Sequence, residues 1–222
     1  MAVQIRLVEE FGATLWKRRI VPILTITEIR HAVPLARALV DGGLPILEVT
    51  LRTPVAIDSA RAILAEVPQA RVGLGTLLEP ADLEQAVEIG AHFAVSPGST
   101  PALLRAAADA PVPFLPGVAT ASEVMLARDA GFRLQKFFPA EAAGGTSWLK
   151  GILGPLPEIS FCPTGGIGLK NLASYLALPN VLAVGGSWLV PATEIGDGLW
   201  PRIAEHALEA RRLVEAMPAV ER

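Results

Sequence analysis

The chain has 222 residues and a formal net charge of −3 at pH 7, with 51% hydrophobic and 18% charged residues. Its longest basic cluster, at residues 17–19, is too short to indicate a nucleic-acid partner. The single cysteine, Cys162, excludes an internal disulfide and fits a reducing compartment. No signal-peptide pattern is present, and no apolar run reaches the roughly 20 residues of a membrane span. We therefore expect a soluble, cytoplasmic protein without a membrane partner.

Short, apolar, β-rich runs recur along the chain at intervals of roughly 20–27 residues. Each is followed by an Ala- and Leu-rich amphipathic segment of helical length, as a series of strand–helix units requires. A leading helix is expected over residues 5–18 and a long final helix over residues 197–217. The expected strands begin at Ile20, Pro45, Arg71, Ala91, Val112, Phe132, Ile159 and Asn180.

Residues typical of helix ends lie between these runs. Threonine followed by proline, at residues 53–54 and 100–101, places a capping hydroxyl before a proline suited to the first helical position. Residues 120–123 fit a capping box. Glycines are expected to close the helices before the second, fourth and sixth strands; they are Gly42, Gly43, Gly90 and Gly131.

Eight strand–helix units in this length predict an α/β fold, namely a (β/α)₈ TIM barrel with an extra N-terminal helix at its bottom. No linker or low-complexity tract interrupts the chain, so residues 1–222 are expected to form a single barrel domain. The competing interpretation is a doubly wound open sheet. Such sheets usually need fewer strands, and no GxGxxG pattern follows the first strand.

Lys136, one of four lysines, lies in the apolar stretch FRLQKFFPAE. A charged amine is costly to desolvate, so a lysine in an apolar strand needs an explanation. One explanation is chemical, because an amine held away from water is more readily neutral and can attack a carbonyl to form a Schiff base. The other is structural, with a packed stem and an amine that reaches solvent. This stretch alone leaves both open.

Alternation along the second strand, LEVTLRT, puts Glu48, Thr50 and Arg52 on one face and apolar residues on the other. The apolar face is expected to contact helices, so Glu48 and Arg52 point into the barrel or its mouth. The same alternation places Lys136 on the inward face of the sixth strand. A carboxylate, a guanidinium and an amine thus converge, either as a buried ion network that holds the barrel together or as a functional site.

Polar and glycine residues also stand at the ends of later strands, where a barrel places its active site. Thr76 and Thr164 end the third and seventh strands. Their hydroxyls either bind a ligand or belong to ordinary cap and turn residues. Glycine pairs at 165–166 and 185–186, the second followed by Ser187, come after the seventh and eighth strands. Barrels often bind phosphate in these two loops, because glycines let backbone N–H groups approach an anion. Ordinary tight turns are the alternative.

The remaining candidates for chemistry are weaker. His31, His92 and His206 are scattered without metal-ligand spacing, and no acidic pair suited to Mg²⁺ stands at a strand end, so no metal is expected. Cys162 lies within an apolar strand and is expected to be a packed thiol.

Seven motifs together carry a family resemblance: LEVTLRTP, VGLGT, FAVSPG, FLPGVATASE, KFFPAEAAGG, FCPTGGI and VGGSWLVP. With them the chain resembles the 2-keto-3-deoxy-6-phosphogluconate (KDPG) aldolases of the Entner–Doudoroff pathway and the related 4-hydroxy-2-oxoglutarate (KHG) aldolases. The resemblance covers nearly the whole chain. It implies a class I, Schiff-base aldolase that acts on a phosphorylated keto acid, as a homotrimer of (β/α)₈ barrels without metal or cofactor.

The resemblance also implies roles for individual residues. Lys136 matches the Schiff-base lysine and Glu48 the catalytic glutamate. Arg52 matches the arginine that holds the pyruvate carboxylate, and Thr76 and Thr164 match substrate-contacting threonines. The phosphate end of the site is matched by Gly165, Gly166, Gly186 and Ser187. Two departures from the pattern are modest: Pro45 opens a strand, and Gln135 is more polar than its helix-facing position suggests.

The implied reaction is reversible cleavage of KDPG to pyruvate and glyceraldehyde 3-phosphate. Unphosphorylated KHG and 2-keto-3-deoxy-6-phosphogalactonate share the pyruvate half of the substrate, and residue spacing does not distinguish them. A phosphosugar isomerase or epimerase on the same barrel is an alternative, as is a barrel that only binds phosphosugars. Neither alternative predicts a covalent pyruvate adduct.

Overall fold

The computed structural model describes residues 2–218, so the outermost positions of the expected 1–222 domain lie outside the described residues. Within that range the strands pair in parallel, six in the order β5-β4-β3-β2-β1-β9 and three in the order β6-β7-β8. All eight expected strand regions are present, the fifth divided into two. The strands are β1 (Ile20–Leu24), β2 (Ile46–Thr50), β3 (Arg71–Gly75), β4 (Phe93–Val95), β5 (Phe114–Leu115), β6 (Gly117–Val118), β7 (Leu134–Phe137), β8 (Ser160–Pro163) and β9 (Val184–Gly186).

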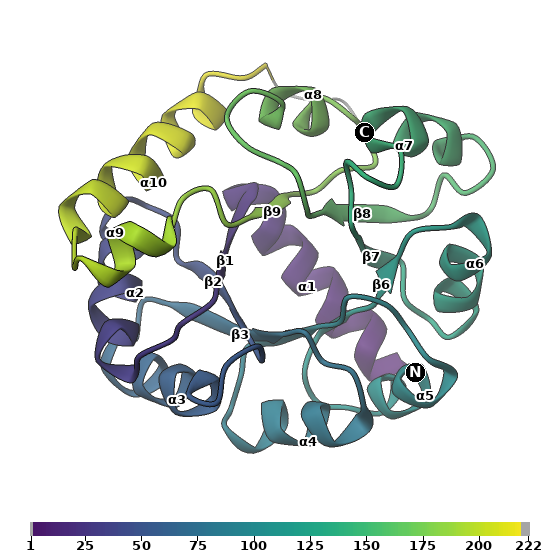
Figure 1. Cartoon of the computed structure of the whole chain (residues 1–222). Helices are drawn as coiled ribbons and strands as arrows, with labels where there is room; N and C mark the ends of the chain where they lie inside the picture. Colours follow the sequence, from purple (N-terminus) through teal and green to yellow (C-terminus); the bar gives the residue numbers. More distant parts are fainter. Residues whose placement is uncertain (1, 219–222) are drawn as a thin grey trace.

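Helices surround the curled strands, and α1 lies across the middle of the ring in the view of Figure 1. The first helix starts earlier than expected, at Ala2, and the last one starts later, at Trp200. The helices are α1 (Ala2–Arg18), the 3₁₀ turn η1 (Ile29–His31), α2 (Ala32–Asp41), α3 (Ala56–Glu66), α4 (Pro80–Glu88), α5 (Pro101–Ala108), α6 (Ala121–Asp129), α7 (Gly145–Leu153), α8 (Leu172–Leu176), α9 (Ala192–Gly196) and α10 (Trp200–Glu215). Among residues 2–218, no helix combines the length and the apolar character that crossing a bilayer requires.

The six-stranded and three-stranded sheets meet at two seams. Only Pro116 separates β5 from β6, and its carbonyl accepts a hydrogen bond from the Lys136 backbone N–H at 2.9 Å. Beyond β8, the isolated bridge between Thr164 and Gly185 links this region to β9. The observed fold is therefore an α/β fold with a parallel, curled sheet.

The core has two layers, one inside the curled sheet and one between the sheet and the outer helices. In the inner layer, Val8, Phe11 and Leu15 of α1 pack against strand residues, and the Phe11 ring stacks on Phe93 with ring centroids 4.6 Å apart. The Gln4 amide fixes the start of α1 by donating to the carbonyl of Ala110 at 2.9 Å. Because both faces of β1 and β2 are covered, every residue of these strands is buried.

The predicted helix caps are confirmed at two sites and wrong at a third. Thr100 caps α5 by accepting from the Leu103 N–H at 3.2 Å, and Thr120 with Glu123 forms the capping box of α6. Thr53 does not cap α3, which begins three residues later. Its hydroxyl instead donates to the Ile26 carbonyl at 2.5 Å, because a tertiary acceptor lies within its reach.

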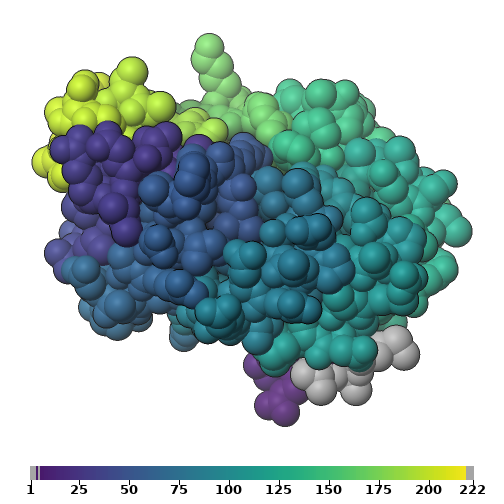
Figure 2. All heavy atoms as spheres, turned by 60° about the horizontal axis from the view of Figure 1, so that its bottom comes forward, coloured from purple at the N-terminus to yellow at the C-terminus, as the bar shows by residue number. Residues whose placement is uncertain are grey.

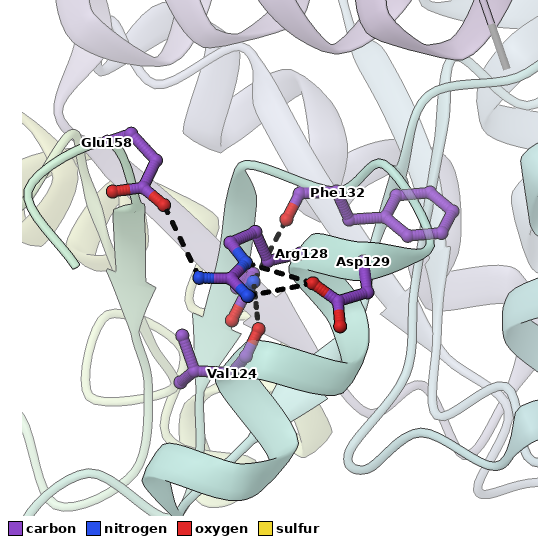
Figure 3. A network of polar contacts seen from close by, with 6 residues as sticks. Val124, Arg128, Asp129, Phe132 and Glu158 are labelled. Carbon is purple, nitrogen blue, oxygen red and sulfur yellow. Dashed lines mark hydrogen bonds and ion pairs between the residues drawn. The ribbon is translucent and has the colours of Figure 1, made fainter.

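Gln135, the unexpectedly polar neighbour of Lys136, ties β7 to α6. Its side-chain amide donates to the carbonyls of Val124, at 3.1 Å, and Phe132, at 2.9 Å, both labelled in Figure 3. Beside them, Arg128 pairs with Asp129 at 2.8 Å (Figure 3). These contacts explain a polar residue on the helix-facing side of β7, because an amide there satisfies two backbone carbonyls.

Candidate active site

The centre of the candidate site is a buried pair that spans the interior between the six-stranded and the three-stranded sheet. Nζ of Lys136, on β7, lies 2.9 Å from Oε1 of Glu48, on β2, and their side chains are only 5% and 4% exposed. The period-two alternation of both strands turns these two side chains inward, as predicted. Removing one partner of such a pair strands a charge in the interior, so the two groups depend on each other.

Gly75 provides the space that the Glu48 carboxylate occupies. A Cβ atom at Gly75 would lie 2.2 Å from Glu48 Oε1, well inside van der Waals contact. Gly73, two residues earlier, makes room in the same way for the Phe93 ring. The glycines of the VGLGT motif therefore shape the interior of the sheet. The alternation of these glycines on one strand face is a signal visible in the sequence, beyond Thr76 as a site residue.

The other neighbours of Lys136 are uncharged. Its Nζ lies 5.4 Å from the centre of the Phe138 ring, within cation–π range. Cys162 is its register partner on β8, and burial raises the pKa of this thiol to about 12, so the thiol stays neutral. Glu48 is accordingly the charged group in direct contact with the amine.

A pocket of about 220 Å³ opens at the C-terminal ends of the strands. Six of the nine predicted site residues line it: Arg52, Thr164, Gly165, Gly166, Gly186 and Ser187. Lys136 and Glu48 line an adjoining enclosed cavity of about 10 Å³, roughly the room of one water. Thr164 lines both spaces, and its Oγ1 is buried. This threonine is therefore the predicted site residue that the two spaces share.

Arg52 is the ionisable residue of the larger pocket, and Thr76 holds it in place. Nε of Arg52 donates to Oγ1 of Thr76 at 3.2 Å. Thr76 has a φ of +66°, an unusual value for a β-branched residue and one that costs of order 1–3 kcal/mol. A guanidinium fixed in this way provides a planar fork for a carboxylate.

The two predicted glycine loops differ in structure. Gly165 and Gly166 follow β8 with φ values of +102° and +78°, as the loop interpretation expects. Gly185 and Gly186 lie within β9, so their assignment to a loop was wrong. A Cβ at Gly185 would lie 2.3 Å from Thr164 Oγ1, and one at Gly186 would lie 1.8 Å from the Trp188 ring. Both glycines are thus required by packing, while Gly186 still lines the pocket.

The sequence did not single out the four other residues of the pocket wall: Ile23 and Thr25 at the end of β1, Phe138 after β7, and Ile167 after β8. A larger groove of about 440 Å³ runs along α1 near the opposite ends of the strands. Its walls carry Glu9, Arg133 and Glu158 but not the lysine–glutamate pair. Among residues 2–218, no group of three His, Cys, Asp or Glu side chains is arranged to hold a metal ion.

The fold and the site define a class: an α/β enzyme in which a buried lysine–carboxylate pair adjoins a pocket suited to an anion. A family model described as KDPG and KHG aldolase matches residues 12–206. The KHG/KDPG aldolase of Escherichia coli is 52% identical over 191 residues, covering 86% of this chain and 90% of that protein. The chain therefore belongs to the KDPG and KHG aldolase family.

Solved structures agree with this assignment. A KDPG aldolase from Legionella pneumophila, with pyruvate captured as a covalent carbinolamine, has a TM-score of 0.87 and 45% identity, covering 89% of this chain and 96% of that one. The 2-keto-3-deoxy-6-phosphogluconate aldolase of Zymomonas mobilis, solved with 3-phosphoglycerate, has a TM-score of 0.86 and 43% identity. The match covers 92% of this chain and 96% of that one.

Proposed function

We propose that this protein is a class I aldolase that reversibly cleaves KDPG to pyruvate and glyceraldehyde 3-phosphate. The observation that carries the proposal is the 2.9 Å contact between the buried Lys136 amine and the Glu48 carboxylate. A buried amine beside a carboxylate supports the roles of nucleophile and proton acceptor, and Thr164 lines both their cavity and the pocket proposed to bind the anion. The Legionella relative, which holds pyruvate as a carbinolamine, supports the same covalent chemistry here.

The first half of the reaction forms the Schiff base. A proton leaves Nζ of Lys136 for Glu48, and the neutral amine attacks the carbon-2 ketone of the keto acid. Glu48 returns the proton to the carbinolamine hydroxyl, which departs as water and leaves an iminium. The positive iminium nitrogen then draws electrons from the bond between carbons 3 and 4.

The second half breaks that bond and restores the enzyme. Glu48 accepts the proton of the carbon-4 hydroxyl as the bond breaks, glyceraldehyde 3-phosphate leaves, and an enamine remains on Lys136. Protonation of the enamine carbon by Glu48 gives the pyruvate iminium, and water hydrolyses it to free pyruvate. Proton transfer by a positioned side chain typically contributes 10²–10⁴-fold, about the share assigned to Glu48.

The pocket residues bind and orient the substrate. Arg52, held by Thr76, pairs with the carboxylate next to the reacting ketone, and Thr164, which lines both spaces, contacts the substrate between them. Gly165, Gly166, Gly186 and Ser187 bind the 6-phosphate. Binding energy from this remote end orients the reacting bond and so raises the rate of the chemical step.

We also propose that the sheet closes into a (β/α)₈ barrel that forms one domain over residues 1–222. Support comes from the single-residue break at Pro116 and from the bridge between Thr164 and Gly185 at the other seam. The family resemblance favours a homotrimer, and exposed apolar side chains such as Leu78, 62% exposed, offer surface for subunit contacts. Cytoplasmic location remains a prediction from the sequence.

The test of the proposed activity is pyruvate release from synthetic substrates, followed by coupling to lactate dehydrogenase. KDPG is expected to give the highest kcat/KM, at least about tenfold above its carbon-4 epimer and above KHG; tenfold corresponds to about 1.4 kcal/mol of transition-state binding. A higher kcat/KM for the carbon-4 epimer or for KHG would show that this compound, and not KDPG, is the preferred substrate. Release of pyruvate from none of them would refute the proposed function.

Glu48→Gln tests the proton-transfer role. Turnover is expected to fall by about 100-fold or more, while adduct formation with pyruvate persists in part. Glu88→Gln is the matched control, because Glu88 is an exposed carboxylate that pairs with Arg61 at the surface, at 2.8 Å. Full turnover in Glu48→Gln would remove Glu48 from the mechanism.

A further inference from the structure

The glycine loop after β8 brings two backbone N–H groups to the pocket. Gly165 and Gly166 both line it, and neither N–H donates to a loop or side-chain acceptor among residues 2–218. In Figure 2 the segment that continues this loop, in green, projects from the upper edge of the molecule. Two successive N–H groups in glycines with positive φ form a concave donor site for an anion. The contacts behind the loop hold it in this shape.

The carbonyl groups of the two glycines are held from behind. The Gly165 carbonyl accepts from the Glu141 backbone N–H at 3.1 Å. The Gly166 carbonyl accepts from Nδ2 of Asn171 at 3.1 Å, while Oδ1 of Asn171 accepts from the Gly168 N–H at 2.8 Å. One asparagine side chain thus binds both arms of the turn. A carbonyl shares its peptide plane with the N–H of the next residue, so the Glu141 bond orients the Gly166 N–H, and the bond from the Ala140 N–H to the Thr164 carbonyl, at 2.8 Å, orients the Gly165 N–H. The Asn171 bond fixes the peptide that follows Gly166.

A second contact comes from the carboxylate of Glu141. A Cβ at Gly166 would lie 2.6 Å from Glu141 Cγ, so the Glu141 stem packs directly on this glycine. Its Oε1 accepts a hydrogen bond from the hydroxyl of Tyr175, a fully buried residue of α8. Burial and the neighbouring carboxylate raise the pKa of Tyr175, so the phenol keeps its proton and remains the donor.

The charge of Glu141 makes this contact matter for ligand binding. A carboxylate beside an anion site opposes anion binding through like-charge repulsion. The Tyr175 hydroxyl fixes Oε1 on the α8 side and so limits the freedom of the carboxylate to turn toward the pocket. None of Glu141, Asn171 or Tyr175 is among the residues that line the pocket, so they act on a ligand through the shape of the loop and, for Glu141, through its charge as well.

We propose that Asn171, Glu141 and Tyr175 form a clamp of positioning residues that holds the Gly165–Gly166 N–H groups in place for the phosphate end of the ligand. The inference rests on the proposed function for the identity of the substrate, and on the geometry of the loop for the anion site. The clamp therefore governs the preference for phosphorylated over unphosphorylated keto acids, and not the chemistry at Lys136.

Two variants test the clamp with little change of shape. Tyr175→Phe removes only the hydroxyl that holds Glu141. Asn171→Asp keeps the acceptor for the Gly168 N–H but replaces the donor to the Gly166 carbonyl with an oxygen. Ser174→Ala is the matched control, because Ser174 is an exposed neighbour whose hydroxyl bonds to the Asn171 carbonyl at 2.7 Å. Thermal melting of each variant verifies that it is folded.

Binding of inorganic phosphate, titrated by ³¹P NMR, is the primary measurement because it needs no turnover. Tyr175→Phe and Asn171→Asp are each expected to weaken phosphate binding about 3–10-fold, because each removes one hydrogen bond that holds the loop. Ser174→Ala is expected to weaken phosphate binding less than twofold. Adding Glu141→Gln to Tyr175→Phe is expected to restore part of the loss, since it removes the released charge. Unchanged phosphate affinity in both clamp variants would overturn the proposal.

The catalytic measurement compares KDPG with KHG. The clamp variants are expected to lose about 3–10-fold in kcat/KM for KDPG, with a less than twofold change for KHG and for exchange of the pyruvate methyl protons. An equal loss for both substrates would show a general structural role and refute the clamp. If the wild-type protein cleaves neither substrate, the proposed function fails, while the phosphate titration still decides on the clamp.

Discussion

Gly75→Ala is expected to disable the site by displacing the Glu48 carboxylate. The added Cβ would lie 2.2 Å from Glu48 Oε1 and 2.6 Å from its Cγ. Carbon contacts are comfortable at about 3.5–4.0 Å, so the carboxylate must shift by about 1 Å or more. A misplacement of about 1 Å can cost about 100-fold in rate. Separating the carboxylate from the buried Lys136 amine is further expected to reduce the free energy of unfolding by about 3 kcal/mol.

The assay measures kcat for KDPG cleavage and the free energy of unfolding from urea titration. Both are measured at a temperature where circular dichroism shows that the variant is folded. Gly151→Ala is the matched control, since a Cβ at this position in α7 meets no atom within 4 Å. It is expected to keep kcat within twofold and to gain up to about 1 kcal/mol of stability. A folded Gly75→Ala enzyme with kcat within threefold of wild type would refute the reasoning about the Glu48 carboxylate.

Two further predictions concern stability. Gln135→Leu is expected to lower the free energy of unfolding by about 1–3 kcal/mol, because two carbonyls lose their amide donor; an unchanged urea midpoint would contradict this. Burial and the charge of Arg71 lower the pKa of His92 from its ordinary 6.5, so the unfolded chain takes up this proton more readily than the folded one. Stability should therefore fall as the pH drops below about 6.5, and less steeply in His92→Gln. Equal slopes of melting temperature against pH in the two proteins would exclude His92 as a cause.

The parts of the site that sequence analysis predicted depend on local periodicity. Lys136, Glu48 and Arg52 were placed on inward faces because side chains alternate along a strand, and the Lys136–Glu48 contact confirms this for the first two. Thr100 was identified as a helix cap because its hydroxyl reaches an N–H three residues away in the same segment. Such contacts involve residues close together in the chain or a fixed repeat, so they can be read from the sequence.

The parts that sequence analysis missed depend on distant segments. Thr53 has the local signature of a cap, but the Ile26 carbonyl on another segment takes its hydroxyl. Gly75 is needed because the Glu48 side chain of the neighbouring strand occupies its Cβ position. Gly185 looked like a turn residue, yet its missing side chain makes room for Thr164. Each outcome depends on atoms that another segment brings to the residue, and only the alternating glycines at 73 and 75 left a signal of this in the sequence.

The anomaly at Gln135 has the same origin. A polar side chain on a helix-facing strand position conflicts with the hydrophobic pattern, because the two carbonyls that it satisfies, at Val124 and Phe132, are brought to it only by folding. Its neighbour Lys136 conflicted with the pattern in the same way and is explained by Glu48. Of the two polar residues that interrupt this apolar run, Gln135 links β7 to α6 and Lys136 belongs to the candidate site.

Covalent trapping at Lys136 is the most direct test of the proposed chemistry. The protein is incubated with pyruvate, reduced with borohydride and digested, and the peptides are analysed by mass spectrometry. A reduced pyruvyl adduct is expected on the peptide that contains Lys136, at close to one adduct per chain, and no adduct is expected in Lys136→Gln. Lys150→Gln, which removes an exposed lysine of α7, is the control and is expected to trap like wild type. Absence of an adduct, or an adduct on another lysine, would contradict the assignment of Lys136 as the Schiff-base nucleophile.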